Sequence, residues 1–543
     1  MNAFTTSPPS APDLSSPDRS GLLGCLLAVG AGSLALRLWL SVAFPVTGDE
    51  AFFYWWGVFP DWGYYDHPPM VGWLIALMRA LLGDTLWAIR LPAVLLPLAL
   101  GAVLGWAIKP WAGTRAGWAV LFFWLAPLNW LNMLVTTDTP LIFWSMLSVA
   151  MLLRAELRPR MDAAATALYA LAGVFIGCAF LSKYFSVVLG LSYLVYFGLF
   201  RRDRWRGLLI LVLCALPGPA INIAWNMDHG WSNIMFNVFN RNEDEFFEWR
   251  KPLAYLGMMA YLITPAALWM AWRHRMRLAG LTHEGGAGFA AADSPQQAAG
   301  LPARRLLVCL VLVPLAFFAL LSFKKVVGLH WVLSFYPFGF ALLALALPAD
   351  RLKACAVGLA LFTALHVLAV AGVALTEPAD WSRHKFTQKL YPSIVRAYDT
   401  KAILAKAERP GTVLMADAYT PASVYGFERR AYVPVFGPGR FHARQDDLLV
   451  DFSVYAGQTV RIVHGSPPDL ANYRPYFAAV QVETLNQSGV NFYVVEGRGF
   501  DYAAYKAGVL TTTYQRFYNV PDWLPMTGSP FAERLCGQVR CIP

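Results

Sequence analysis

Three candidate carboxylates and a histidine lie in the stretch that follows the first long apolar segment. Asp49 and Glu50 come directly after that segment, and Asp66 and His67 precede two prolines. Because hydrocarbon tolerates ionisable groups poorly, we expect these side chains at a water-accessible site on a membrane face. A carboxylate there can take a proton from a hydroxyl, and a histidine can contact phosphate or act as an acid or base. Helix capping by Asp49 and Glu50, and a structural hydrogen bond by His67, remain as simpler alternatives.

A fourth carboxylate, Asp138, lies in a short turn between two apolar segments. An ionisable residue near the membrane plane is a functional candidate by default. The alternative is that Asp138 or Thr139 caps the helix that starts at Pro140. Both interpretations can hold together.

Several cations lie where apolar segments end on the same predicted face. Lys183 and Lys324 follow two such segments, and Arg90 and Arg241 are weaker candidates of the same kind. Cations at a membrane face can bind a lipid phosphate. The alternative is that they snorkel from the lipid to the interface. Carboxylates beside phosphate-binding cations suit transfer of a group from a phosphate-linked donor to a hydroxyl.

The composition is that of a membrane protein. Of 543 residues, 57% are hydrophobic and 14% are charged, whereas soluble domains carry roughly 25% charged residues. The formal charge of +10 is explained by arginines in cytoplasmic loops, so we do not expect nucleic-acid binding. No Walker loop, Rossmann glycine fingerprint or GxSxG elbow is present in the sequence, which disfavours a nucleotide-sugar donor.

Eleven apolar segments predict a polytopic all-α membrane domain over residues 21–375, although several are shorter than an ideal span of ~20 residues. Residues 1–20 are rich in Ser and Pro and predict a disordered cytoplasmic tail. Every second connection is basic, which places it in the cytoplasm. The loop 45–86 and residues 376–543 are then expected outside.

The region 376–543 is less apolar and predicts a small soluble α/β domain. Short β-like runs occur at 412–415, 459–463 and 491–495. Cys536 and Cys541 lie close together near the end, and whether they form a disulfide is left open. No cysteine spacing resembles a zinc site.

The sequence resembles the GT-C glycosyltransferases, in particular the protein-mannosyltransferase-like family that includes bacterial transferases of aminoarabinose and galacturonic acid to lipid A and lipopolysaccharide core. The motifs that carry the resemblance are Gly48-Asp49-Glu50-Ala51, Gly63-Tyr64-Tyr65-Asp66-His67-Pro68-Pro69, Thr137-Asp138-Thr139-Pro140-Leu141, Leu181-Ser182-Lys183-Tyr184 and Trp225-Asn226-Met227-Asp228-His229-Gly230-Trp231. The resemblance implies an inverting transferase that uses a polyprenyl-phosphate sugar donor. The implied acceptor is a glycolipid, either lipid A or lipopolysaccharide core.

The resemblance also implies roles for single residues. Asp49 matches the catalytic base, and Asp138 matches the second acidic residue. His67 stands where the aminoarabinose transferases have the lysine of a Glu-Lys-Pro segment, so Lys183 or Lys324 is expected to take over the role of that lysine at the lipid phosphate. The full set of expected site residues is Asp49, Asp138 and Glu50 for catalysis, Lys183, Lys324, His67 and Arg90 for the donor phosphate, and Asp66, Tyr65 and Tyr184 for the acceptor or sugar.

Two alternatives stay open. The acceptor could be a protein Ser or Thr, as in protein O-mannosyltransferases, or the chain could transport a polyprenyl-linked substrate. We expect a monomer in a bacterial inner membrane, with the site facing the periplasm and no required metal or other cofactor. The identity of the sugar is not predicted.

Overall fold

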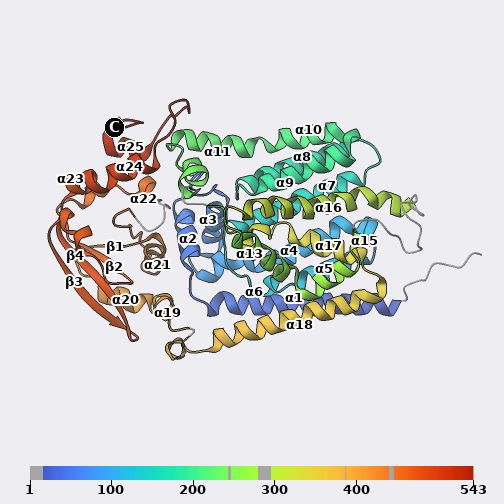
Figure 1. The fold of residues 1–543 in the computed structure, drawn as a ribbon, viewed down its shortest axis with the longest axis horizontal. Coiled ribbons are helices and arrows are strands. Elements are labelled where there is room, and N and C mark those ends of the chain that lie inside the picture. The colour runs from blue at the N-terminus through green and yellow to red at the C-terminus, as the bar shows by residue number, and fades with distance from the viewer. Residues whose placement is uncertain are drawn as a thin grey trace, which may run out of the picture.

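A bundle of long helices carries a smaller domain with a β-sheet at one end (Figure 1). The computed structural model describes residues 16–242, 246–278, 295–383, 385, 387–438 and 445–541. Most of the predicted tail lies outside these residues. Helix α1 (Ser16–Ala43) begins within the part of the tail that the structure describes.

Each predicted apolar segment coincides with a helix or a pair of helices. After α1 these are α4 (Leu86–Ala112), α5 (Arg115–Trp124) with α6 (Leu128–Leu131), α7 (Asp138–Glu156), α8 (Ala163–Phe180), α9 (Ser186–Phe200), α10 (Trp205–Ala215) with α11 (Pro217–Asp228), α13 (Arg250–Ile263) with α14 (Pro265–Arg273), α16 (Pro295–Ser322), α17 (Tyr336–Ala346) and α18 (Ala349–Leu375).

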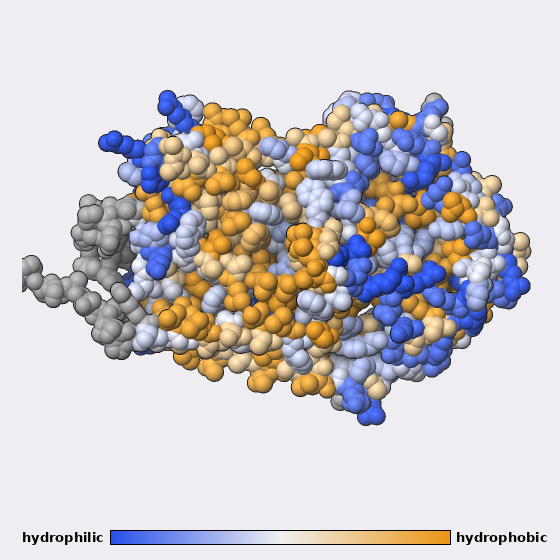
Figure 2. Space-filling view, turned by 180° about the vertical axis from the view of Figure 1, so that it is seen from behind, coloured by the Kyte–Doolittle hydropathy of each residue, from blue (hydrophilic) through white to orange (hydrophobic). Residues whose placement is uncertain are grey.

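Six helices in the described part of the chain are long and apolar enough to cross a membrane, or seven if α13 and α14 form one span bent by 94°. The bend falls at Thr264, which has a φ of 72° and precedes a proline that cannot continue the helix. On the face shown in Figure 2, a broad hydrophobic surface covers the helical half, with hydrophilic surface at its far end and over the sheet domain. A multi-helix membrane domain is thus confirmed, and the number of about eleven spans stays a prediction.

Two short helices lie between the bundle and the sheet domain (Figure 1). Helix α2 (Gly48–Val58) begins at a capping box, in which the Thr47 hydroxyl accepts from the Glu50 N–H and the Glu50 carboxylate accepts from the Thr47 N–H. Its aromatic residues are buried. Helix α3 (Met70–Leu82) follows the Pro-Pro pair and packs against α2.

The C-terminal domain contains a four-stranded mixed sheet in the order β1-β2-β4-β3. Strands β1 (Val413–Ala416) and β2 (Val460–His464) are parallel, and β3 (Phe477–Gln487) and β4 (Val490–Phe500) form an antiparallel hairpin. The three predicted β-like runs lie in β1, β2 and β4, whereas β3 was not predicted. The main helices around the sheet are α19 (Tyr391–Tyr398), α20 (Thr400–Ala407), α21 (Tyr419–Arg429), α24 (Thr511–Phe517) and α25 (Pro530–Cys536).

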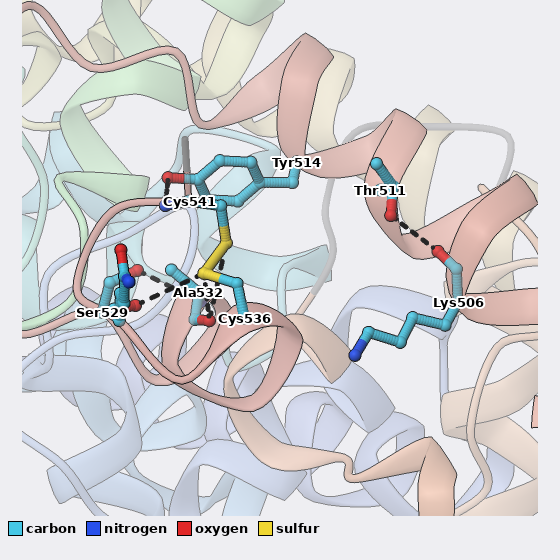
Figure 3. The surroundings of a disulfide bond; sticks show 8 residues. Lys506, Thr511, Tyr514, Ser529, Ala532, Cys536 and Cys541 are labelled. Atoms are coloured by element: carbon cyan, nitrogen blue, oxygen red, sulfur yellow. Dashed lines mark hydrogen bonds between the residues drawn. A yellow bond between two sulfur atoms is a disulfide. The ribbon is translucent and has the colours of Figure 1, made fainter. Parts of the chain in front are cut away.

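Cys536 and Cys541 form a disulfide just after α25 (Figure 3). The Cys541 N–H donates to the hydroxyl of Tyr514 at 3.0 Å, which ties this end of the chain to α24. The five other cysteines are unpaired, and Cys309 and Cys355 are buried.

Candidate active site

A cavity of about 890 Å³ lies where the helical bundle meets the C-terminal domain. Its lining comes from segments far apart in the sequence and combines carboxylates, cations and leucines. The polar and aromatic lining includes Asp49, Asp66, His67, Asp138, Lys183, Tyr184, Asn237, Asn240, Arg241, His330 and Tyr419, and the leucines are Leu128, Leu131, Leu134, Leu329 and Leu333. The cavity therefore offers both charged groups and apolar surface to one ligand.

Asp49 projects into the cavity from the first turn of α2. Its pKa is raised above the usual carboxyl value mainly because the surrounding protein removes solvent from it. The negative charges of Asp66 and Glu50 raise this pKa further, while His67 partly offsets them. A carboxylate with a raised pKa is a stronger base, which suits proton abstraction from a hydroxyl.

Asp66 and His67 lie beside each other at the cavity wall. The His67 Nδ1 is 3.1 Å from Asp66 Oδ2, and both side chains line the cavity. Their loop is held by backbone contacts, because the Tyr64 N–H donates to the His67 carbonyl and the Asn237 amide donates to the Asp66 carbonyl, at 3.0 and 2.8 Å. The structure thus brings both predicted residues to the same site as Asp49.

Asp138 and Lys183 form an ion pair in the cavity wall. The Lys183 Nζ donates to both carboxylate oxygens, at 2.8 and 2.9 Å, and both residues are buried. Asp138 opens α7 without capping it, since its carboxylate accepts from Lys183. The Thr136 hydroxyl accepts from the Asp138 N–H, and the Thr139 hydroxyl accepts from the Thr136 N–H. The structure therefore places Lys183 inside the protein and does not favour snorkelling.

His330 and Arg241 add two cationic or titratable groups that the sequence analysis did not rank highly. His330 lies in a short 3₁₀ helix, Leu329–Val332, and Arg241 in another, Asn240–Asn242. Burial lowers the pKa of His330, Asp138 raises it, and the positive charges of Lys183 and Arg241 lower it further. The sequence did not mark His330 as a site residue.

Charged groups of both signs meet in the cavity. The charges of Asp66 and His67 shift the pKa of Asp49. The charges of Asp138, Lys183 and Arg241 shift the pKa of His330. The charge of His67 lowers the pKa of both Asp49 and His330. The cavity therefore brings carboxylates and cations together, as a reaction needs when a base and a phosphate act on one substrate pair.

Tyr184 also lines the cavity, as expected of a sugar-contacting residue. Its hydroxyl lies 3.0 Å from the side-chain oxygen of Asn222 and also contacts that of Asn233. The Asn233 amide donates in turn to the Tyr64 carbonyl at 2.8 Å. This network holds the Asp66-His67 loop in place from the side of α11.

Glu50 and Arg90 do not line the cavity. Both are fully buried, and the Arg90 guanidinium donates to the two Glu50 oxygens at 2.8 and 2.7 Å. Arg90 also donates to the carbonyls of Ser41, Phe44 and Pro45, so it joins α4 to the end of α1 and the start of α2. This geometry favours a structural role over the catalytic and phosphate-binding roles expected of the pair.

Lys324 and Tyr65 are also placed away from the cavity lining. Lys324 is exposed after the end of α16. Tyr65 is buried, its ring packs against Phe236 and Tyr518, and its N–H donates to the Gln445 side chain at 3.0 Å. Tyr65 therefore fastens the outer loop to the C-terminal domain.

The C-terminal domain closes one side of the cavity through α21. Tyr419 lines the cavity, and its ring packs on Phe52 of α2 with centroids 5.1 Å apart. The next residue, Thr420, lies so close to Gly48 that a Cβ on that glycine would fall 2.1 Å from the Thr420 Cγ2. A larger residue at position 48 would collide with Thr420, so this close approach requires glycine. Gly48 directly precedes Asp49 in the chain.

Within the described part of the chain, no three His, Cys, Asp or Glu side chains are grouped so that they could hold a metal ion. The expectation that no metal is required stays a prediction.

Comparison with known proteins points to one family. Residues 66–225 match the family model described as dolichyl-phosphate-mannose-protein mannosyltransferase. A lipid A galacturonosyltransferase, RgtD of Rhizobium johnstonii, is 29% identical over 242 residues, which are 41% of this chain and 49% of that protein. The chain thus spans about half the length of this curated relative. These matches confirm the resemblance to protein-mannosyltransferase-like GT-C enzymes.

Two solved structures share the fold. They are ArnT from Cupriavidus metallidurans in the apo state, with a TM-score of 0.62, and the same protein bound to undecaprenyl phosphate, with a TM-score of 0.58. Each is 16% identical; the matches cover 88% and 87% of this chain, respectively, and 98% of each solved chain. The likeness shows that both the membrane domain and the C-terminal domain follow one known architecture.

Proposed function

We propose that this chain is a GT-C glycosyltransferase that moves a sugar from a polyprenyl-phosphate donor to a glycolipid acceptor on the outer membrane face. The observation that carries the proposal is the cavity that joins Asp49 to a group of cations and to leucine-rich walls. The match of residues 66–225 to the mannosyltransferase model and the lipid A galacturonosyltransferase relative support the same reaction class.

In the proposed step an acceptor hydroxyl attacks the anomeric carbon of the donor sugar. Asp49 takes the hydroxyl proton as the new C–O bond forms. The bond between the anomeric carbon and the phosphate oxygen breaks, and polyprenyl phosphate leaves with the electron pair. Attack opposite the leaving group inverts the anomeric centre.

The leaving phosphate is proposed to lie near Lys183 and Arg241. Lys183 and Arg241 would stabilise the negative charge that develops on it, and His67 and His330 would donate hydrogen bonds to it. Asp138 holds the Lys183 ammonium in the wall by a two-oxygen contact, so its role is to position that cation. The leucines of the lining suit the first isoprene units of the donor.

The two sequence matches differ in the acceptor that their names describe. The family model names a protein acceptor, and the curated relative names lipid A. We favour the glycolipid because the named relative is a lipid A enzyme. A protein Ser or Thr is the second candidate.

The test is mass spectrometry of the envelope glycolipids from cells that lack this chain, complemented with the wild type or with Asp49→Asn. We expect a sugar-sized mass to be lost on deletion and restored by the wild type alone. Asp350→Asn, at the exposed start of α18, is the matched control and should restore it fully. Loss of a sugar from an envelope protein would show that the acceptor is a protein Ser or Thr. Equal restoration by Asp49→Asn would exclude Asp49 as the base.

A further inference from the structure

A second, smaller cavity lies wholly within the C-terminal domain. Its volume is about 250 Å³, and its polar lining comes from α19, from the loop after β1, from the first turn of α21 and from the loop after β2. The polar side chains are Ser393, Arg396, Asp417, Thr420 and Ser466. Because β1 and β2 are parallel neighbours, their carboxyl ends meet at this cavity, and that edge is where open α/β sheets bind ligands.

A guanidinium lies at this cavity. The Arg396 Nη2 donates to the Ser393 hydroxyl at 3.3 Å, and a Cβ on Gly465 would lie 3.4 Å from Arg396 Nη1. The guanidinium therefore lies close to the loop after β2. Helix α21 also begins here, with Thr420 and Pro421 in the lining, so the positive end of its dipole adds to the attraction for an anion.

The carboxylate of Asp417 lies at the same cavity and is held by a chain of contacts with two buried side chains. The Asp417 Oδ2 is 3.4 Å from the Nδ1 of His464, and the Nε2 of His464 is 2.9 Å from the Tyr473 hydroxyl. His464 and Tyr473 are both buried. These contacts orient Asp417, so that one carboxylate and one guanidinium share a space with three hydroxyl groups.

This combination selects a ligand class. A bare phosphate would be repelled by Asp417, and a neutral sugar would leave Arg396 without a charged partner. A sugar with an anionic substituent satisfies both, since its hydroxyls can donate to Asp417 while its phosphate or carboxylate meets Arg396. We propose that this pocket binds a sugar unit that carries a phosphate or a carboxylate.

The position of the pocket connects it with the candidate active site. The first turn of α21 separates the two cavities: Tyr419 lines the larger one and Thr420 the smaller one. Thr420 also touches Gly48, the residue before Asp49. The pocket therefore holds the anionic part of the acceptor headgroup while another part of the headgroup reaches Asp49. This assignment to the acceptor rests on the proposed function, whereas the binding of an anionic sugar does not.

The binding test uses the purified full-length chain in detergent and isothermal titration with glucosamine 1-phosphate. Arg396→Gln and Asp417→Asn should each weaken binding tenfold or more. Arg409→Gln, an exposed arginine of the same domain, is the matched control and should leave the affinity unchanged. Glucosamine and inorganic phosphate, titrated separately, should each bind much more weakly than the sugar phosphate.

Three outcomes would overturn the proposal. Unchanged affinity in Arg396→Gln would show that the guanidinium is not used. Equal affinity for inorganic phosphate would show that no sugar is recognised. Binding that is lost in Arg241→Gln and kept in Arg396→Gln would place the ligand in the larger cavity.

A kinetic arm tests the assignment to the acceptor. Arg396→Gln should raise the KM for the acceptor at unchanged kcat and unchanged KM for the donor. If the wild type binds glucosamine 1-phosphate at this pocket but transfers no sugar, the proposed function fails and the binding site stands. If it transfers sugar and Arg396→Gln behaves as wild type in both assays, the pocket proposal fails alone.

Discussion

Asp49 and Glu50 are neighbours in the chain with opposite environments. Successive residues on a helix point about 100° apart, so one faces the cavity and the other faces α4. Glu50 finds a guanidinium and two backbone N–H groups and is buried. Asp49 meets Asp66, His67 and the open cavity, which leaves its carboxylate available for chemistry.

The raised pKa of Asp49 predicts a specific pH dependence. A base must be deprotonated, so kcat/KM should fall as the pH drops through a pKa above the usual carboxyl range. Asp66→Asn removes a charge that raises this pKa and should move the acidic limb to lower pH. His67→Ala removes a charge that lowers it and should move the limb to higher pH. The pH profile of sugar transfer measures both shifts, and a limb that neither variant moves would contradict Asp49 as the titrating base.

The Asp138–Lys183 pair predicts separable effects on folding and on donor binding. Breaking a buried ion pair from one side costs about 3–5 kcal/mol, because the other charge is left uncompensated. Lys183→Met alone should therefore lower both stability and affinity for the polyprenyl-phosphate donor. The double variant Asp138→Asn with Lys183→Met should recover stability but not donor affinity. Thermal unfolding and donor titration distinguish these outcomes, and recovery of donor affinity in the double variant would show that Lys183 does not contact the phosphate.

At the scale of elements, α2 is the piece on which the site depends. It starts at a capping box, is anchored to α1 and α4 by Arg90, and packs against α3 on one side and α21 on the other. Aromatic contacts with the C-terminal domain continue along it, from Phe52 with Tyr419 to Tyr54 with Phe427. The position of Asp49 therefore depends on both domains.

The Glu50–Arg90 pair should be worth far more to stability than an exposed pair. Glu50→Gln leaves Arg90 buried without a counter-charge and should destabilise the chain by about 3–5 kcal/mol. Adding Arg90→Met should restore part of that loss. Asp380→Asn, which removes an exposed pair with Arg383, should cost no more than about 1 kcal/mol. Denaturant unfolding in detergent gives these values, and similar losses in Glu50→Gln and Asp380→Asn would refute the anchoring role.

The contact between Gly48 and Thr420 predicts a rescue experiment. Gly48→Ala places a methyl group against the Thr420 Cγ2 and should push α21 away from α2, at a cost of about 1–3 kcal/mol. Thr420→Ser removes that methyl carbon and should restore activity in the Gly48→Ala background. Gly24→Ala, in a position of α1 with no atom within 4 Å, is the control. Wild-type transfer rates in Gly48→Ala would show that the domains need not approach so closely.

The placement of the whole molecule in a membrane follows from where its surface is apolar and where it is polar. The apolar surface of the bundle requires lipid, and the hydrophilic sheet domain lies at one end of it, so that end must emerge from the membrane (Figure 2). The cavity sits at this junction. A lipid-linked donor can then reach the cavity from the bilayer while a polar acceptor approaches from water.

The predicted orientation can be measured by cysteine labelling. In a background without the five unpaired cysteines, Val454→Cys should react with a membrane-impermeant maleimide in spheroplasts, because this exposed residue belongs to the C-terminal domain. Arg160→Cys, in the exposed connection between α7 and α8, should react only after permeabilisation. The reverse pattern would invert the topology and place the cavity on the cytoplasmic face.

The sequence alone determined where the membrane helices lie and which segments carry the chemistry. Hydropathy is a property of short stretches of sequence, so each predicted apolar segment corresponds to a helix or a pair of helices. Charge placement then marked Asp49, Asp66, His67, Asp138 and Lys183, all of which line one cavity. Strand β3 escaped prediction because much of it is exposed, which left no clear hydrophobic alternation.

Tertiary structure alone decided which charged residues face the cavity. Glu50 is paired with Arg90, which lies 40 positions away, and Tyr65 is held by Gln445, which lies 380 positions away. Such partners leave no local signal, since burial and pairing depend on how distant segments pack. The same packing brings His330 and Tyr419 into the cavity and keeps Lys324 out of its lining. The sequence thus named the reactive groups, and the fold selected among them by supplying some with buried partners.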